Sequence, residues 1–387
     1  MPAVRKPEIL MTPGPTPVPA EVLLAQASPI VYHRGPGFGD ALRDCIQGLQ
    51  WLLGTRNDVL TFTCSGTGAM ESTVVNCFSP GDRVLIVSVG NFGQRFGTIA
   101  SAYGLDVKML DYEWGRTAKA ADVAAALEPD IKGVFVQHSE TSTGVVNDIE
   151  PIAAVVREHP ALMIVDTVSG LGASPLRVDE WGIDVAAGGV QKAIMMSPGI
   201  GFVSVSDAAW KAYERSTCPR FYFDWGPVKR SHDLPDPESP YTPAVSLFLG
   251  LRDSLRMLRR EGLENVFARH RLLSRAVKAS VQAMGLELIG EDQDRAVCVT
   301  AIRCPEGIDG DAITALVRER FGIVFAPGQD KWKGKVFRIG HLGYLSPADV
   351  LQAMAALEMC LNELGHPVKD GAGVAAAQEV FAQETRA

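Results

Sequence analysis

The sequence predicts an α/β protein in which a large domain, built on a mostly parallel sheet covered by helices, precedes a smaller α+β domain. The first observation behind this prediction is that strand and helix patterns alternate between residues 59 and 205. Such alternation is typical of a parallel sheet with helices on both faces. The second observation is that a long irregular segment, residues 215–245, breaks the alternation, and fewer elements follow it.

The amino-terminal segment, residues 1–35, is rich in proline, as in Thr12-Pro-Gly-Pro-Thr-Pro-Val-Pro. Because proline fixes φ and has no backbone N–H, we expect an extended arm here rather than a helix. Residues 37–54 have apolar side chains at helical spacing and predict the first helix.

The alternating part of the chain follows. The predicted strands are Val59–Thr63, Arg83–Ser88, Val107–Leu110, Gly133–Gln137 and Leu162–Val165, and then Ile183–Ala187 and Gly201–Val205. The predicted helices between them are Gly66–Cys77, Phe92–Tyr103, Ala118–Leu127 and Ile149–His159. Residues 215–245 are expected to form a long functional loop.

A helical region, about residues 244–284, is expected to lead into the second domain. There the predicted strands are Ala296–Ile302, Ile323–Phe325 and Lys335–Ile339, and the predicted helices are Gly310–Phe321 and Pro347–Leu364. We expect an arm at residues 1–16, a large domain at 17–255, a small domain at 256–365 and a tail at 366–387. The tail should form a short surface helix at most.

Composition excludes several classes of function. The chain has 387 residues, 47% of them hydrophobic and 21% charged, which fits a soluble globular protein. A net charge of -8 argues against a nucleic-acid partner, which requires a basic surface. The seven cysteines are scattered and predict reduced thiols in a cytoplasmic protein without a metal framework. No apolar run suggests a signal peptide or a membrane partner.

Lys192 lies among small and apolar residues between two predicted strands, and its nearest charged neighbours are Asp184 and Asp207. Burial disfavours the ammonium form, so an amine in such a place can be neutral and nucleophilic near pH 7. A nucleophilic lysine in a dry pocket suits a Schiff base with an aldehyde cofactor. The alternative is a lysine at a strand end whose amine reaches water.

The run from Cys64 to Glu71 lies where a predicted strand meets a helix. Its glycines, together with Ser65 and Thr67, would expose backbone N–H groups to an anion such as a phosphate. An ordinary helix cap is the alternative. A dinucleotide site is disfavoured, because Glu71 replaces the third small residue of that motif and the next strand does not end in an acidic residue.

Three more residues are candidates because of their places relative to strands. Asp166 ends a predicted strand and could pair with a protonated ring nitrogen, or could simply close a turn. Phe92 follows a strand and could stack on a flat ring, or pack in the core. Arg338 lies inside an apolar strand and needs a partner, either a substrate carboxylate or an internal acid.

Together these residues supply an amine, a phosphate cradle, a partner for a ring nitrogen, a stacking face and a carboxylate clamp. This combination predicts pyridoxal 5'-phosphate (PLP) as cofactor and an amino acid as substrate.

The chain resembles the class V, fold-type I PLP-dependent aminotransferases, above all the alanine–glyoxylate, serine–glyoxylate and serine–pyruvate aminotransferases. The resemblance covers residues 9–365 and rests on short motifs in matching order and spacing. These motifs are Pro13-Gly-Pro-Thr, His33-Arg34, Ser65-Gly-Thr-Gly-Ala-Met-Glu, Gly90-Asn-Phe-Gly-Gln-Arg, His138-Ser-Glu-Thr-Ser-Thr-Gly-Val, Val165-Asp-Thr-Val-Ser, Gly189-Val-Gln-Lys, Tyr241-Thr-Pro and Arg338-Ile-Gly.

The resemblance implies a role for each matching residue. Lys192 would hold the internal aldimine, and Asp166 would pair with the pyridine nitrogen. Phe92 and Val168 would lie on the two faces of the ring, and Thr141 would lie near its hydroxyl. The residues implied for phosphate binding are Ser65, Gly66, Thr67, Gln191 and, from the neighbouring subunit, Tyr241 and Thr242. Arg338 would bind the substrate carboxylate, and Gly14 would lie beside the substrate.

Two positions depart from the family pattern. The stacking residue is often tryptophan in the animal enzymes and is Phe92 here, while Thr67 stands where some relatives carry histidine. Neither departure changes the expected chemistry, but both make the expected substrate less specific.

The resemblance implies a ping-pong transamination through a Lys192 aldimine in a homodimer with shared active sites. Serine or alanine would be the amino donor, and glyoxylate or pyruvate the acceptor. An amine-specific relative of the pyridoxamine–pyruvate type is an alternative that His341 keeps open. A PLP lyase of the cysteine desulfurase kind is disfavoured because residues 326–334 contain no cysteine. A non-enzymatic subunit of another complex is the remaining alternative.

Overall fold

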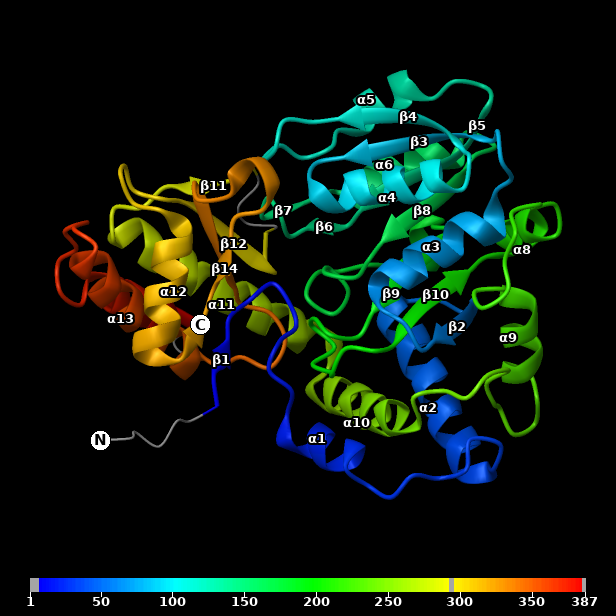
Figure 1. Cartoon of the computed structure of the whole chain (residues 1–387), viewed down its shortest axis with the longest axis horizontal. Helices are drawn as coiled ribbons and strands as arrows, with labels where there is room; N and C mark the ends of the chain where they lie inside the picture. Colours follow the sequence, from blue (N-terminus) through cyan, green and yellow to red (C-terminus); the bar gives the residue numbers. More distant parts are fainter. Residues whose placement is uncertain (1–6, 292–295, 385–387) are drawn as a thin grey trace.

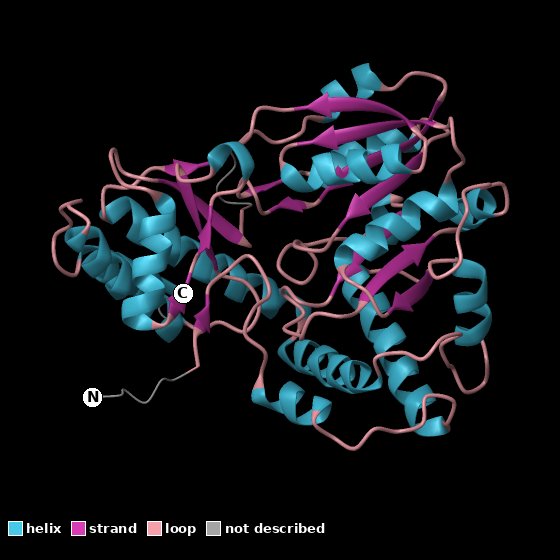
Figure 2. Ribbon diagram, viewed as in Figure 1, coloured by secondary structure: helices cyan, strands magenta, loops and turns pink. Residues whose placement is uncertain are grey.

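The structure is a computed structural model that describes residues 7–291 and 296–384. Parts of the predicted arm and tail, residues 1–6 and 385–387, lie outside the described residues. Figures 1 and 2 show a larger sheet with helices on both faces and a smaller sheet with its own helices beside it.

The larger sheet has seven strands in the order β2-β10-β9-β8-β5-β3-β4. They are β2 (Asp58–Phe62), β3 (Arg83–Ser88), β4 (Asp106–Asp111), β5 (Ile131–Gln137), β8 (Leu162–Asp166), β9 (Val185–Gly189) and β10 (Gly201–Val205). Strand β10 runs antiparallel to both of its neighbours, and the pairs from β9 to β4 are parallel. The predicted α/β fold with a mostly parallel sheet is therefore confirmed.

Helices bury both faces of this sheet. One face packs against α2 (Pro36–Leu53), α5 (Ala120–Ala126), α6 (Ile149–Arg157), α7 (Val178–Trp181) and α10 (Val245–Glu261). The other face packs against α3 (Gly66–Cys77), α4 (Asn91–Ala102), α8 (Asp207–Tyr213) and α9 (Trp225–His232). Strand β5 shows the alternation that this requires, since Val134 and Val136 lie in the first core and Phe135 lies in the second.

The smaller sheet is antiparallel, with the order β11-β12-β15-β14. Its strands are β11 (Leu288–Ile289), β12 (Val299–Arg303), β14 (Ala326–Pro327) and β15 (Val336–Gly340). The helices around it are α11 (Leu263–Ala283), α12 (Gly310–Phe321), α13 (Pro347–Glu363) and α14 (Ala372–Glu384), with the short 3-10 helix η1 (Asp330–Trp332). These elements enclose a separate hydrophobic core.

Two short strand pairs lie outside the two larger sheets. Strand β1 (Ile9–Leu10) pairs in parallel with β13 (Ile323–Val324), so the amino-terminal arm is attached to the region of the smaller sheet. Strands β6 (Ser139–Glu140) and β7 (Val145–Val146) form a hairpin after β5. From β1 the chain passes between the two sheets before it reaches the larger one (Figure 1).

Two predictions of irregular structure are wrong. Residues 20–26 form helix α1 (Ala20–Gln26), because the prolines end at Pro19 and the segment that follows has helix-forming residues with Val22 buried. Within the predicted loop at 215–245, α9 forms because the Asp224 side chain accepts a hydrogen bond from Gly226 N–H and Trp225 is fully buried.

The helical region at 244–284 is two helices, because Gly262 adopts φ 84° between α10 and α11. The tail forms the 13-residue helix α14, whose Ala377 is buried in the smaller core. Among the described helices, none combines the length and the apolar character that a membrane span requires.

Candidate active site

Lys192 lies just beyond the carboxyl end of β9, in the turn that leads to β10. Its side chain is 7% exposed, and its Nζ donates a hydrogen bond to the Pro13 carbonyl at 2.5 Å. The hydroxyl of Thr16 donates to the Lys192 carbonyl at 2.9 Å. The arm is therefore fixed to the turn that carries the lysine.

Gly14 lies directly against the Lys192 side chain. A Cβ atom at Gly14 would be 2.5 Å from Lys192 Cδ and 2.9 Å from Nζ, and the residue adopts φ 134°. Both the close approach and the backbone conformation require glycine here. Gly14 therefore lies beside the lysine, and its expected place beside the substrate stays a prediction.

Asp166 ends β8, and its carboxylate is 4% exposed. Burial raises the pKa of Asp166 to about 7, although the Val168 N–H group donates to its Oδ1 at 2.9 Å and opposes this shift. Burial also lowers the pKa of Lys192 to about 8, against the attraction of Asp166 for the ammonium form. Both groups are thus shifted toward neutral pH, as acid–base chemistry requires.

The start of α3 lies at the same edge of the sheet. A Cβ at Gly189, three residues before Lys192, would be 3.3 Å from the backbone of Gly66, and a Cβ at Gly66 would be 2.6 Å from Val168 Cγ2. Ser65 precedes this helix but does not cap it with its side chain. The first amides of α3 therefore remain available to an anion at a helix amino terminus.

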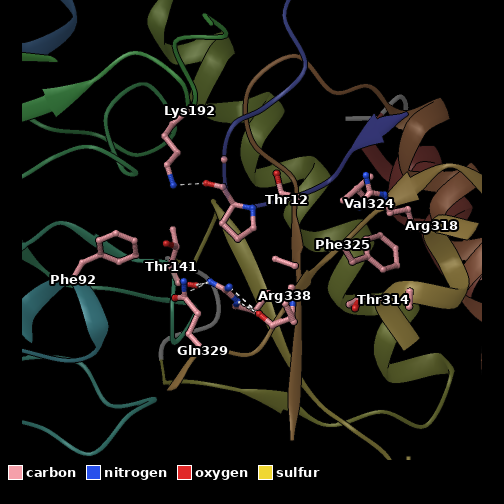
Figure 3. A pocket seen from close by; sticks show the side chains of 15 residues that line it. Thr12, Phe92, Thr141, Lys192, Thr314, Arg318, Val324, Phe325, Gln329 and Arg338 are labelled. Atoms are coloured by element: carbon pink, nitrogen blue, oxygen red, sulfur yellow. Dashed lines mark hydrogen bonds between the residues drawn. The ribbon is translucent and has the colours of Figure 1, made fainter. Parts of the chain in front are cut away.

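A cavity of about 470 Å³ lies between the larger sheet, the arm and the smaller sheet. Lys192, Gly14, Phe92, Thr141 and Arg338 all line it, so five of the residues predicted from the sequence meet there. Figure 3 shows Lys192 above Phe92 and Thr141, which lie side by side, with Gln329 and Arg338 below them. The volume lies within the range of small-molecule sites, about 300–1,000 Å³.

Arg338 lies in β15 and is 4% exposed. Its guanidinium donates to the Pro327 carbonyl at 2.8 and 3.0 Å and to the Thr141 carbonyl at 2.8 Å. Among the residues described, none places a carboxylate within ion-pair distance of this group. Burial lowers the pKa of Arg338 to about 10. A buried cation whose partners are carbonyl groups is suited to receive an anionic ligand.

Phe92 lies in the first turn of α4, and the Arg95 guanidinium lies 4.6 Å from the centre of its ring. Arg95 also donates to the Thr67 hydroxyl at 3.2 Å. Phe92 and Thr67, which are far apart in the sequence, are thereby connected through one side chain.

Tyr241 and Thr242 are not brought to this cavity. They line a separate depression with Thr61 and Phe62, and Tyr241 stacks on Tyr222 at 5.3 Å between ring centres. Within one chain the structure therefore leaves both residues outside the Lys192 cavity.

Several site residues were missed by the sequence reasoning. The fully buried carboxylate of Glu140, the Gln329 side chain and the Pro13 carbonyl all contact residues of the site. The sequence signal that could have pointed to Glu140 is the unbroken polar run from Gln137 to Thr143, which directly follows the apolar part of a strand. In the structure every residue of this run is buried. Buried polar runs directly after a strand are unusual unless a site uses them.

The arrangement suits a flat, phosphorylated aldehyde. The amine of Lys192 can form a covalent bond with the aldehyde, the start of α3 can bind the phosphate, and Asp166 can hold a protonated ring nitrogen. The fully buried amide of Gln137 pairs in register with Asp166 and has no hydrogen-bond partner among the described residues, as a ligand-facing group would. Within residues 7–291 and 296–384, no group of three or more His, Cys, Asp or Glu side chains could hold a metal ion.

Comparison with known proteins agrees with this chemistry. The family model described as aminotransferase class-V matches residues 13–332. In Synechococcus sp. (strain PCC 6716), a protein named soluble hydrogenase, small subunit, is 44% identical over 96% of this chain and 98% of its own length.

Relatives named for transamination are almost as similar. The L-aspartate–glyoxylate aminotransferase of Paracoccus denitrificans is 39% identical over 98% of this chain and 97% of that protein. The serine–glyoxylate aminotransferase of Methylorubrum extorquens is 38% identical over 97% of each chain. The crystal structure of ureidoglycine–glyoxylate aminotransferase from Bacillus subtilis superimposes with a TM-score of 0.94, at 31% identity over 99% of this chain and 100% of that one.

Proposed function

Since this chain belongs to the class V aminotransferase family and uses PLP, we propose that it transfers the amino group of serine or alanine to glyoxylate or pyruvate. The observation that carries the proposal is a single cavity lined both by the buried amine of Lys192 and by the buried guanidinium of Arg338, which donates to the carbonyls of Pro327 and Thr141. An amine that can bond to an aldehyde and a cation that can bind a carboxylate are the two groups an amino-acid transaminase needs.

The proposed substrates are small because the cavity of about 470 Å³ must also hold the reacting part of the cofactor. Glyoxylate is favoured as acceptor, since it occurs in the names of the Paracoccus, Methylorubrum and Bacillus relatives. Those names differ in the amino donor, so the choice between serine and alanine rests on the resemblance of the motifs. Transfer from an amine of the pyridoxamine type to a 2-oxo acid is the alternative within the family.

PLP, when bound, supplies an aldehyde and an electron-withdrawing ring. In the proposed arrangement Ser65, Gly66, Thr67 and Gln191 would hold its phosphate. Phe92 and Val168 would hold the ring between them, and Thr141 would contact the ring hydroxyl. Asp166 would keep the ring nitrogen protonated, because a buried carboxylate is stabilised by a positive charge that faces it.

Lys192 is proposed to act twice. Its amine would hold the cofactor, and once freed by an amino acid its Nζ would accept and return the proton of the substrate Cα. Arg338 holds the substrate carboxylate, and Gly14 leaves room for the substrate beside Lys192. Donor and acceptor use the same cavity in turn, which gives ping-pong kinetics.

We further propose a cytoplasmic homodimer. Tyr241 and Thr242 lie on an exposed aromatic surface in which Phe221 is 78% and Tyr222 is 41% exposed. A second copy that covers this surface could receive Tyr241 and Thr242 at its own phosphate site. All seven cysteines are free thiols, which suits a reducing compartment.

A half-reaction screen tests the proposed function. The protein is loaded with PLP, and the visible absorbance of the bound cofactor is followed as serine, alanine, glycine or aspartate is added. We expect serine or alanine to bleach the band, and glyoxylate or pyruvate to restore it. A protein that stays colourless with PLP would instead support a non-enzymatic subunit of another complex; the Synechococcus relative is named as a subunit.

A further inference from the structure

Glu140 is a fully buried carboxylate that none of the roles above uses. It lies at the end of β6, and its two oxygens accept four hydrogen bonds. Oε2 accepts from Phe92 N–H at 2.9 Å and from Gly93 N–H at 3.2 Å. Oε1 accepts from Ser142 N–H at 3.1 Å and from the Ser142 hydroxyl at 2.6 Å. The carboxylate therefore joins the β6–β7 hairpin to the first turn of α4.

These bonds complete the amino terminus of α4. Helix α4 begins after Gly90, which has no side chain to cap it, and Ser142 Oγ accepts the Asn91 N–H at 3.0 Å. The first three N–H groups of the helix thus find their acceptors in the hairpin. A negative charge is favourable at this end of a helix. The position of the Phe92 backbone, and with it the ring that faces the cavity, is set by Glu140.

The same hairpin also contacts the smaller sheet. Thr141, the next residue after Glu140, accepts the hydrogen bond from Arg338 through its carbonyl at 2.8 Å. A Cβ at Gly144 in the hairpin turn would be 3.0 Å from Ala301 Cβ in β12. The hairpin is therefore held between α4, which carries Phe92, and β15, which carries Arg338.

Gly90 shows that the fit around Glu140 is close. A Cβ there would lie 2.4 Å from Ser142 Oγ and 2.5 Å from Glu140 Cγ. The φ of Gly90 is 170°, an extended conformation that any residue can adopt, so the contact with the hairpin alone requires glycine. An added methyl group would displace the carboxylate without removing its charge.

We propose that Glu140 is a positioning residue that fixes the stacking ring of Phe92 and the carboxylate-binding Arg338 relative to each other. The inference rests on the proposed function, because it assigns Phe92 to the cofactor and Arg338 to the substrate. Since one rigid connection serves both, disturbing Glu140 should weaken cofactor binding and substrate binding together.

The test uses the full chain with Glu140→Gln and Gly90→Ala. The first variant replaces an acceptor oxygen by a donor, and the second displaces the intact carboxylate. For each, the Kd of PLP is measured by titrating the PLP-free protein and following the visible band. The KM of the amino donor is then measured at saturating PLP, and Tm is measured without PLP.

Glu358→Gln is the matched control. Glu358 is 6% exposed and also accepts from helix N–H groups, those of Gly373 at 2.5 Å and Val374 at 3.1 Å in α14, but it lies in the smaller core away from the cavity. A loss of stability alone should therefore appear in this variant without any change in the site.

We expect Glu140→Gln and Gly90→Ala each to raise the PLP Kd and the donor KM by about tenfold or more, the effect of losing a charged hydrogen bond. Glu358→Gln should lower Tm and leave both constants unchanged. The inference is overturned if both Glu140→Gln and Gly90→Ala keep wild-type constants, or if Glu358→Gln shifts them equally. A wild-type protein that binds no PLP would contradict the proposed function itself and is a separate outcome.

Discussion

Glu140 and Glu358 perform the same local task in two regions of the molecule. Each is buried, and each accepts hydrogen bonds from the second and third N–H groups of a helix, α4 for Glu140 and α14 for Glu358. The difference lies in what the helix carries. The first turn of α4 presents Phe92 to the cavity, whereas the start of α14 attaches the carboxyl-terminal segment to α13.

The two regions also differ in the groups that surround each glutamate. By the catalytic junction we mean Lys192 and Arg338, which line the cavity, together with the buried carboxyl groups of Asp166 and Glu140. Burial there shifts the pKa values of Lys192 and Asp166 toward neutrality. In the tail-docking region, which consists of α11, α13 and α14, Glu358 accepts from three backbone N–H groups. We infer that the buried ionisable groups of the catalytic junction lower the stability of the folded protein and serve its reaction. The tail-docking region, in contrast, contributes only to stability.

Lys192→Ala should show the largest contrast between an effect on activity and an effect on stability. Removing the amine that bonds to the cofactor and moves the proton should lower turnover by at least about 10³-fold. Because the burial of this amine is unfavourable, Tm of the PLP-free protein should not fall. Stopped-flow absorbance with serine or alanine measures the first quantity and calorimetry the second. Turnover within tenfold of wild type would show that Lys192 does not have this role in the reaction.

Asp166→Asn should lower turnover by about 100-fold, because a neutral amide stabilises a protonated ring nitrogen less well. Steady-state kinetics at saturating PLP measure this loss. An unchanged rate would mean that Asp166 does not face the ring.

The same variant makes a prediction for pH. Burial raises the pKa of Asp166 from 3.8 to about 7, so between these values the folded PLP-free protein binds more protons than the unfolded chain. The free energy of unfolding contributed by this group therefore falls as pH rises through that window. Asp166→Asn should be more stable than wild type at pH 7, and the two should converge toward pH 4. Equal differences in Tm at both pH values would contradict the shift.

Arg338→Lys should raise the KM of the amino donor by about tenfold, since lysine keeps the charge but loses the forked geometry that binds a carboxylate. Binding of PLP should stay the same, which distinguishes this variant from Glu140→Gln. A donor KM that does not change would show that the carboxylate binds elsewhere.

Glu358→Ala should have the smallest effect on activity and a clear effect on stability. Three N–H groups lose their acceptor, so the free energy of unfolding should decrease by about 1–3 kcal/mol, with kcat and KM unchanged. Denaturant unfolding measures the loss. A change in KM in this variant would show that the tail-docking region also affects substrate binding, and would contradict the difference between the two regions.

The sequence predicted the regular elements well where local signals were strong. The bounds of α3, β3 and α12 agree with the prediction, because glycine, charge or a capping aspartate marks their ends. Helices α1 and α9 were missed because proline and polar residues nearby suggested irregular structure, while the burial of Val22 and Trp225 depends on tertiary contacts.

The candidate site divides in the same way. Lys192, Phe92, Thr141 and Arg338 were identified from their places at strand ends or within strands, and they do line one cavity. Their chemical roles remain predictions. Glu140 was not singled out because the polar run around it does not show that Glu140 bonds to Phe92 and Gly93, which lie 48 and 47 residues away.

The most direct test of the central claim is to locate the covalent bond between cofactor and protein. The PLP-loaded protein is reduced with borohydride and digested, and the modified peptide is identified by mass spectrometry. The account predicts the cofactor mass on Lys192 alone, and its loss when serine or alanine is added before reduction. Attachment to a different lysine, or labelling of Lys192 that neither amino acid diminishes, would contradict it.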